Sequence, residues 1–233
     1  MTCKFYSEIQ EGVRRVKDGI EAAAAEANRH PDEITLVGVT KTQPVEAVRA
    51  LLNAGVYEIG ENRVQELLQK SPFITDIPHK THLIGNLQRN KAKYLPGKID
   101  MLQSVDRAET VIALEKAYVG GKEVLDVLIE VNIGDETSKN GITLGEVYPL
   151  AEQVMASKAL CLRGFMTIPP ICKGDLVRRY FQIYRLFIDI REKTRDNNTI
   201  TILSMGMSSD YKEAILEGAT MVRVGTALFG NRV

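Results

Sequence analysis

The chain of 233 residues has equal numbers of acidic and basic residues, 30 of each, so its formal net charge is zero. That balance argues against a surface that neutralises phosphates, and we expect no nucleic-acid partner. No apolar run reaches the roughly 18 residues of a membrane span, and the N-terminus lacks the apolar core of a signal peptide. The three cysteines form no CxxC motif. We therefore expect a cytoplasmic protein with no membrane contact and no bound metal.

Length and composition fit one barrel-sized domain. An α/β barrel commonly takes roughly 200–250 residues, and a hydrophobic content of 44% is enough for a sizeable core. No linker-like, low-complexity or strongly charged segment divides the chain. The sequence therefore predicts a single domain over residues 1–233.

Apolar spacing divides the chain into a first helix and eight strand–helix units. Residues 5–28 carry apolar side chains three or four positions apart, which predicts a helix ended by His30 and Pro31. Short apolar runs predict strands at residues 34–40, 56–60, 81–85, 99–103, 124–133, 160–166, 199–203 and 220–224. The helices expected after them span residues 44–55, a segment from 63, and residues 89–94, 107–119, 144–157, 176–193, 210–217 and 227–229.

This alternation predicts the architecture. Strands separated by helices pair in parallel, because each crossover needs a helix. Eight such units close into a (β/α)8 TIM barrel, here with an additional N-terminal helix. An open doubly wound sheet is the competing architecture, but it more often carries a GxGxxG motif after its first strand, and this sequence has none.

Candidate functional residues follow the predicted strands, where a barrel builds its active face. Lys41 comes directly after the first strand, and partial burial there would favour the neutral amine and Schiff-base chemistry. Ser208, Gly225 and Thr226 lie in the loops after the last two strands, the recurrent phosphate site of this architecture. A solvated lysine and ordinary turns are the structural alternatives. An amine beside a phosphate site indicates pyridoxal phosphate or a sugar-phosphate aldehyde.

Seven sequence motifs occur in order along nearly the whole chain. They are GVTKTQP at 38–44, GENRVQE at 60–66, HLIGNLQRNK at 82–91, SKNG at 138–141, GFMTI at 164–168, LSMGMSSD at 203–210 and VRVGTALFG at 222–230. Together they resemble the YggS/PROSC family of pyridoxal-phosphate-binding proteins. Thr81, where an aromatic residue is frequent, and Asn86 depart from the pattern without touching the lysine or phosphate motifs.

The resemblance implies a fold-type III barrel, as in the N-terminal domain of alanine racemase, with pyridoxal 5'-phosphate (PLP) held on Lys41 as an internal aldimine. In the matching motifs, Ser208, Gly225 and Thr226 would hold the phosphate, and Asn62 would lie beside the cofactor. The cofactor-binding residues that the resemblance implies are Lys41, Asn62, Ser208, Arg223, Gly225 and Thr226. Members of the family are PLP homeostasis proteins without an established catalytic activity.

Arg223, which the resemblance places at the pyridine nitrogen, bears on whether the site is catalytic. PLP is a strong electron sink when a carboxylate keeps this nitrogen protonated, and an arginine cannot accept that proton. Related racemases also use an arginine, but they draw a second acid/base from a C-terminal domain for which this chain leaves no room. We therefore predict a monomeric carrier that stores PLP and transfers it during transient contact with apo-enzymes, without catalytic residues.

The sequence leaves open two alternative functions and the role of one lysine. A racemase-like PLP enzyme on the same site is the first alternative to the carrier. An interaction module is the second, with Val177, Phe181, Tyr184 and Ile188 as its surface, although core packing explains this stripe more simply. Lys139 is either a transient second amine or, more simply, a solvated loop lysine.

Overall fold

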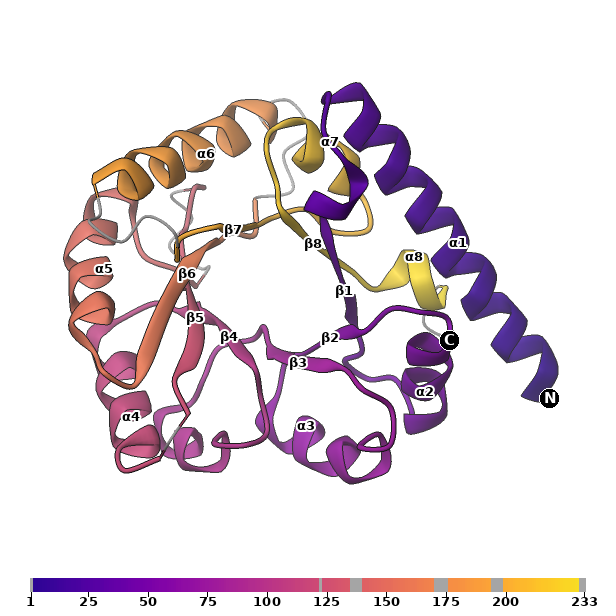
Figure 1. Ribbon diagram of the computed structural model, residues 1–233, viewed down its shortest axis with the longest axis horizontal. Coiled ribbons are helices and arrows are strands. Elements are labelled where there is room, and N and C mark those ends of the chain that lie inside the picture. Colours follow the sequence, from indigo (N-terminus) through magenta and orange to yellow (C-terminus); the bar gives the residue numbers. More distant parts are fainter. Residues whose placement is uncertain (1, 122, 135–139, 170–175, 194–198, 231–233) are drawn as a thin grey trace.

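The structure is a closed parallel barrel. It is a computed structural model that describes residues 2–121, 123–134, 140–169, 176–193 and 199–230. Each strand pairs with the next along the chain, and β8 pairs back onto β1, so the predicted (β/α)8 fold is confirmed (Figure 1). The strands are β1 Thr35–Val39, β2 Glu58–Glu61, β3 Lys80–Leu83, β4 Met101–Val105, β5 Leu125–Glu130, β6 Leu160–Met166, β7 Ile202–Ser204 and β8 Met221–Val224.

Helices surround the barrel. They are α1 Thr2–Glu26, α2 Val45–Asn53, α3 Val64–Lys70, α4 Ala108–Tyr118, α5 Val147–Ala156, α6 Leu176–Lys193, α7 Tyr211–Leu216 and α8 Thr226–Phe229. Four short 3-10 segments join them, at Pro31–Glu33, Ser71–Phe73, Arg89–Tyr94 and Leu144–Glu146. The segment expected to be helical at 89–94 is thus a 3-10 helix, a form that suits such short connectors.

Helix α1 lies outside the barrel, along the seam where the chain begins and ends (Figure 1). It packs on α2, α7 and α8 through a buried stripe that includes Ile9, Val13, Val16 and Ile20. A Cβ on Gly12 would lie only 2.4 Å from the carbonyl oxygen of Leu228. A residue without a side chain is therefore needed where α1 crosses α8.

The interior of the barrel is filled by side chains, as in other eight-stranded barrels. An apolar cluster of Val37, Met101, Leu128, Met166 and Met221 occupies it, separate from the larger core between strands and helices. Polar side chains of the strands are also almost fully buried, among them His82, Gln103, Ser204 and Arg223. The interior therefore combines an apolar filling with polar groups that need partners.

Helix α6 differs from the sequence-based expectation in the face that it buries. Among the described side chains of this helix, Tyr180, Ile183, Phe187 and Ile190 are buried, whereas Phe181 is 49% exposed. The side chain of Val177 lies outside the described part. The expected core stripe included Phe181 and is wrong at that position, because docking against the barrel selects a face of the helix rotated by about one residue.

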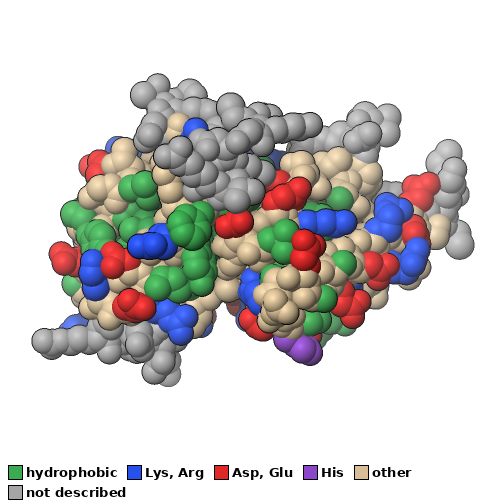
Figure 2. Space-filling model, turned by 90° about the horizontal axis from the view of Figure 1, so that it is seen from above, with side chains coloured by type: hydrophobic (Ala, Val, Ile, Leu, Met, Phe, Trp, Pro, Cys, Tyr) green, Lys and Arg blue, Asp and Glu red, His purple; other side chains and the backbone are tan. Residues whose placement is uncertain are grey.

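Charged side chains of both signs are interspersed on the described part of the face in Figure 2, in keeping with the zero net charge. Of the helices in the described ranges, none combines the length and the apolar character needed to cross a membrane. The same ranges contain no group of three His, Cys, Asp or Glu side chains arranged to hold a metal ion.

Candidate functional site

The carboxyl ends of the strands bring five of the six predicted site residues to one cavity of about 460 Å³. Its lining includes Lys41 after β1, Ser208 after β7, Arg223 of β8, and Gly225 and Thr226 after β8. This volume lies within the roughly 300–1,000 Å³ of small-molecule sites. A larger cavity of about 690 Å³ lies at the opposite face of the barrel, away from Lys41.

Asn62, the sixth predicted residue, follows β2 directly and does not line this cavity. Its side-chain Oδ1 is buried and accepts no hydrogen bond from the described residues. A buried acceptor without a donor costs free energy, and such an atom commonly meets a ligand or a water molecule.

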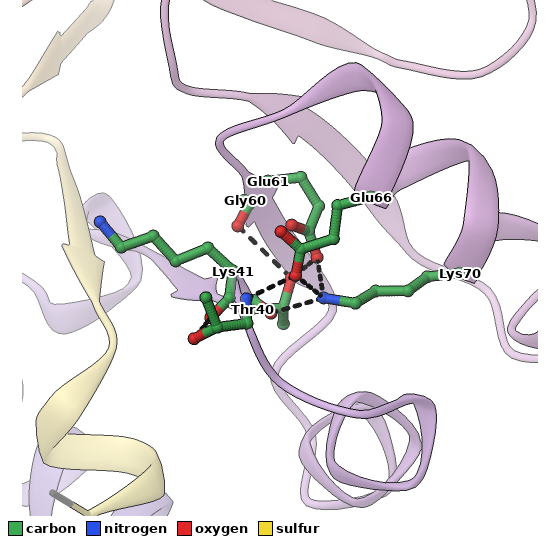
Figure 3. A network of polar contacts seen from close by, with 7 residues as sticks. Thr40, Lys41, Gly60, Glu61, Glu66 and Lys70 are labelled. Atoms are coloured by element: carbon green, nitrogen blue, oxygen red, sulfur yellow. Dashed lines mark hydrogen bonds and ion pairs between the residues drawn. The ribbon is translucent and has the colours of Figure 1, made fainter. Parts of the chain in front are cut away.

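Lys41, which follows β1, is half-buried. Figure 3 shows its side chain extending away from a cluster of charged residues and toward the yellow ribbon of β8 and α8. Thr42, the next residue, has a φ of 63°, which is uncommon for a β-branched side chain. The chain therefore turns sharply immediately after the lysine.

A buried cluster of Glu61, Glu66 and Lys70, the lysine clamp, holds this turn from behind (Figure 3). The Lys70 ammonium donates to the Thr40 carbonyl oxygen at 2.7 Å, to Glu61 Oε1 at 2.8 Å and to Glu66 Oε1 at 2.6 Å. An ammonium has three donors, so these bonds satisfy it fully.

The same carboxylates bond to both peptide neighbours of Lys41. Glu66 Oε1 accepts the Thr42 N–H, and Glu61 Oε1 accepts the Thr40 hydroxyl at 2.6 Å. Burial raises the pKa of Glu61, and the Lys70 and Thr40 hydrogen bonds oppose that rise without cancelling it. The lysine clamp thus fixes the backbone on each side of Lys41 and leaves its amine on the cavity side.

The loop after β7 and the turn after β8 meet at Ser208. The backbone N–H groups of Gly225 and Ala227 both donate to Ser208 Oγ, each at 3.2 Å. Asp210 braces this loop by accepting the Met207 N–H at 2.7 Å and the Tyr180 hydroxyl at 2.6 Å. Converging backbone donors around one oxygen are the arrangement that binds a phosphate oxygen.

Arg223 is a buried cation at the edge of the cavity. Its guanidinium donates to Ser204 Oγ at 2.6 Å and to the Thr167 carbonyl oxygen at 2.9 Å. Burial lowers the pKa of Arg223 to about 10, while Tyr180, Glu130 and Asp210 act in the opposite direction. The side chain remains a cation at neutral pH.

Glu130, at the end of β5, is a buried carboxyl that the sequence did not single out. Burial and the nearby charge of Asp106 raise its pKa from 4.5 to about 7, against the opposing effect of Arg223 and Arg107. Between these two values the folded protein holds a proton that the unfolded chain has lost. The contribution of Glu130 to the free energy of unfolding therefore falls as the pH rises through this window.

Glu130→Gln is expected to remove that pH dependence. Relative to the wild type, the variant should gain up to about 3 kcal/mol of unfolding free energy between pH 4.5 and 8, from about 1.4 kcal/mol per pKa unit. Urea denaturation of the cofactor-free protein at both pH values measures this difference in unfolding free energy. Glu192→Gln, on the surface of α6, is the control. A difference between Glu130→Gln and wild type that does not change with pH contradicts the assignment.

The sequence does not reveal the role of Lys70, because a lysine four residues after Glu66 in a helix is typical of an exposed pair. The Glu66–Lys70 spacing was the available signal, but it does not show burial. Glu61 forms the end of β2 and its side chain accepts a hydrogen bond from Lys70. Lys139 lies outside the described residues.

Comparison with known proteins assigns the family. Residues 16–233 match the family model described as alanine racemase, N-terminal domain. A pyridoxal phosphate homeostasis protein of Aquifex aeolicus is 40% identical over 225 residues, which cover 95% of this chain and 97% of that protein.

Solved structures agree. A Bifidobacterium adolescentis protein described as unknown superposes with a TM-score of 0.90 at 31% identity, covering 97% of this chain and 96% of its own. PipY of Synechococcus elongatus, solved with PLP bound, gives a TM-score of 0.79 at 30% identity, covering 91% of this chain and 100% of its own. The fold is therefore that of the barrel domain of the alanine racemase family. Within it, the chain belongs to the family of pyridoxal phosphate homeostasis proteins.

Proposed function

We propose that this protein binds PLP at the Lys41 cavity and serves as a carrier of the cofactor rather than as an enzyme. The observation that carries the proposal is that the Lys41 side chain shares one cavity with Ser208, Gly225 and the buried cation Arg223. The curated relative is named a PLP homeostasis protein, and PipY was solved with PLP bound.

The residues present fit the cofactor. The paired N–H groups of Gly225 and Ala227, which now share Ser208 Oγ, form the kind of oxygen-binding cradle that a phosphomonoester needs. When bound, PLP supplies an aldehyde that combines reversibly with an amine. Lys41 would provide that amine, and Thr226 would help to hold the phosphate. Asn62 does not line this cavity, so its place beside the cofactor rests on the family motif.

Arg223 favours storage over catalysis. A guanidinium has donors only, so placed at the ring nitrogen it keeps this nitrogen unprotonated and weakens the electron-withdrawing power of the ring. The proposal extends to a monomeric protein with one barrel domain in the cytoplasm, which passes PLP to apo-enzymes by transient contact and binds neither nucleic acid nor membrane.

Spectral titration and cofactor transfer test the proposal. Adding PLP to the cofactor-free protein should produce a saturable absorption band in the violet at one equivalent. Mixing the loaded protein with a PLP-dependent apo-enzyme should then restore that enzyme's activity as the band declines. Pyridoxal, which lacks the phosphate, should bind at least about tenfold more weakly, a difference of about 1.4 kcal/mol. A protein that takes up no PLP contradicts the proposal.

The match to the alanine racemase model makes a racemase-like enzyme the second candidate. Incubation of the loaded protein with single-enantiomer amino acids in deuterium oxide separates the two. We expect no exchange of the α-proton above the rate given by free PLP. Exchange at enzyme-like rates, from about 1 per second upward, would replace the carrier with an enzyme.

A further inference from the structure

A chain of four hydrogen bonds crosses the interior of the barrel from Arg223 to Glu58. Arg223 Nη1 lies 2.6 Å from Ser204 Oγ, which lies 2.8 Å from Gln103 Oε1. Gln103 Nε2 lies 2.9 Å from His82 Nδ1, and His82 Nε2 lies 2.9 Å from Glu58 Oε2. These five residues are called the barrel relay below. They come from five strands, and the bond between β4 and β7 spans the barrel rather than following the sheet (Figure 1).

The barrel relay has a single direction. Arg223 can only donate, so Ser204 accepts from it and donates its own proton to the Gln103 carbonyl oxygen. The Gln103 amide then presents N–H to His82 Nδ1, which must accept. His82 therefore carries its proton on Nε2 and donates it to the Glu58 carboxylate. A cation ends the relay on one side and an anion on the other, an arrangement in which each bond polarises the next.

The two ends open into different cavities. Arg223 lines the 460 Å³ cavity that contains Lys41. Glu58 and His82 line the 690 Å³ cavity at the amino ends of the strands, called the floor cavity. The relay thus runs between opposite faces of the barrel through side chains that, apart from Glu58, are at most 4% exposed.

The charges around His82 are mixed. The ionic side chains that line the floor cavity beside Glu58 are Lys80, Lys98, Asp100, Glu123, Asp126 and Arg163. His79 and Tyr118 are its other titratable groups. Lys80 also pairs with Glu58 at 3.5 Å. Burial alone would raise the pKa of Glu58, but the hydrogen bond and charge of His82, with Lys80, lower it overall. Glu58 therefore stays ionised under mildly acidic conditions.

We propose that the protonation of His82 at the floor cavity sets the hydrogen-bonding state of Arg223 at the PLP site, with Gln103 and Ser204 as positioning residues between them. The proposal rests on the proposed function only where it says that Arg223 faces the cofactor. It assigns to the floor cavity a role in tuning cofactor affinity through pH.

The physical reason lies in the number of donors. A protonated His82 carries N–H on both ring nitrogens, so its Nδ1–H opposes the N–H of Gln103. The Gln103 amide must rotate, which turns its NH2 group toward Ser204. Ser204 Oγ then faces donors from both Gln103 and Arg223, and its own proton has to leave the relay. Acidification at the floor therefore makes Arg223 share the Ser204 oxygen with a second donor, which weakens the Arg223–Ser204 bond and should weaken PLP binding.

Nitrogen-15 NMR of the cofactor-free protein tests the coupling without PLP. The chain has three histidines, so His82→Gln identifies the His82 signals. We expect the Nε2–H tautomer in the wild type. Ser204→Ala, two bonds away, should free the Gln103 amide and raise the midpoint of the His82 titration by about half a pH unit or more. Gln103→Met, which removes the opposing donor at similar length, should shift it in the same direction.

Ser104→Ala is the matched control. It removes a buried hydroxyl from β4, the strand of Gln103, and this hydroxyl donates to the Gly85 carbonyl oxygen at 2.7 Å, outside the relay. An Nδ1–H tautomer in the wild type overturns the proposal. So does a His82 titration midpoint that is the same in Ser204→Ala and Gln103→Met as in the control Ser104→Ala.

The effect on the cofactor is measured separately. The ratio of the PLP dissociation constants of wild type and His82→Gln should rise several-fold as the pH falls through the midpoint found by NMR. A constant ratio across that midpoint contradicts the link to the PLP site. If NMR shows the coupling in a protein that fails to bind PLP, the proposed function is contradicted, whereas the coupling along the relay is still supported.

Discussion

Lys41→Ala is expected to abolish the violet absorption band and to raise the dissociation constant for PLP at least about a hundredfold, equal to about 2.7 kcal/mol. The phosphate cradle at Ser208 and Gly225 would remain, so the variant should keep weak, colourless binding. The large loss follows because, in the proposed site, the Lys41 amine would provide the covalent link, which no contact of the cradle can replace. Absorption titration measures the band, and fluorescence quenching measures the residual affinity.

Surface lysines also react with aldehydes, so the assignment needs a control. Lys116→Ala removes an exposed lysine on α4 and should leave both the band and the affinity unchanged. Borohydride reduction of the loaded wild type, followed by peptide mass spectrometry, should place the added mass on residue 41. A full band in Lys41→Ala, or labelling spread over many lysines, contradicts the proposed site.

Lys70→Met is expected to lower the free energy of unfolding by about 3–5 kcal/mol, the usual cost of breaking a buried ion pair from one side. The side chain of Lys70 is 9% exposed, and its removal leaves Glu61 and Glu66 with uncompensated charge. Urea denaturation measures the loss. PLP affinity should fall as well, since the turn that presents Lys41 loses its support.

The loss of unfolding free energy in Lys70→Met should depend on pH. Burial already raises the pKa of Glu61, and removing the ammonium raises it further, so mild acid should protonate the carboxyl and restore part of the stability. Adding Glu61→Gln to Lys70→Met should recover part of the loss at neutral pH. Lys116→Met, on the exposed face of α4, should stay within about 0.5 kcal/mol of the wild type. Equal stability of the two lysine variants would show that the lysine clamp is unimportant.

The barrel could be predicted because its signals are local. Alternating apolar runs and helical stripes repeat eight times, and the strand Leu160–Met166 and the helix Leu176–Lys193 have the bounds that periodicity predicts. The proximity of Lys41 and Ser208 could also be predicted, because parallel strands of a barrel bring their carboxyl ends to one face. Family motifs added expected roles for Arg223 and Asn62 beside the cofactor, which spacing alone does not give and which stay predictions.

The contacts that the sequence does not reveal form only when the barrel closes. Lys70 is an ordinary helical lysine until β1 and β2 lie side by side and bring the Thr40 carbonyl to it. His82 likewise gains its hydrogen-bond partners Gln103 and Glu58 only inside the closed barrel. Its partner Gln103 and that residue's partner Ser204 are 101 positions apart, a distance that no local pattern reports.

The pairing of β1 with β8 has a consequence for the nascent chain. Lys41 follows the first strand, whereas Arg223 and Gly225 belong to the last, so the two halves of the cavity are made at opposite ends of synthesis. A ribosome-bound chain that lacks β8 has the lysine without the cradle. Acquisition of the cofactor at this cavity would thus mark a translated and closed barrel.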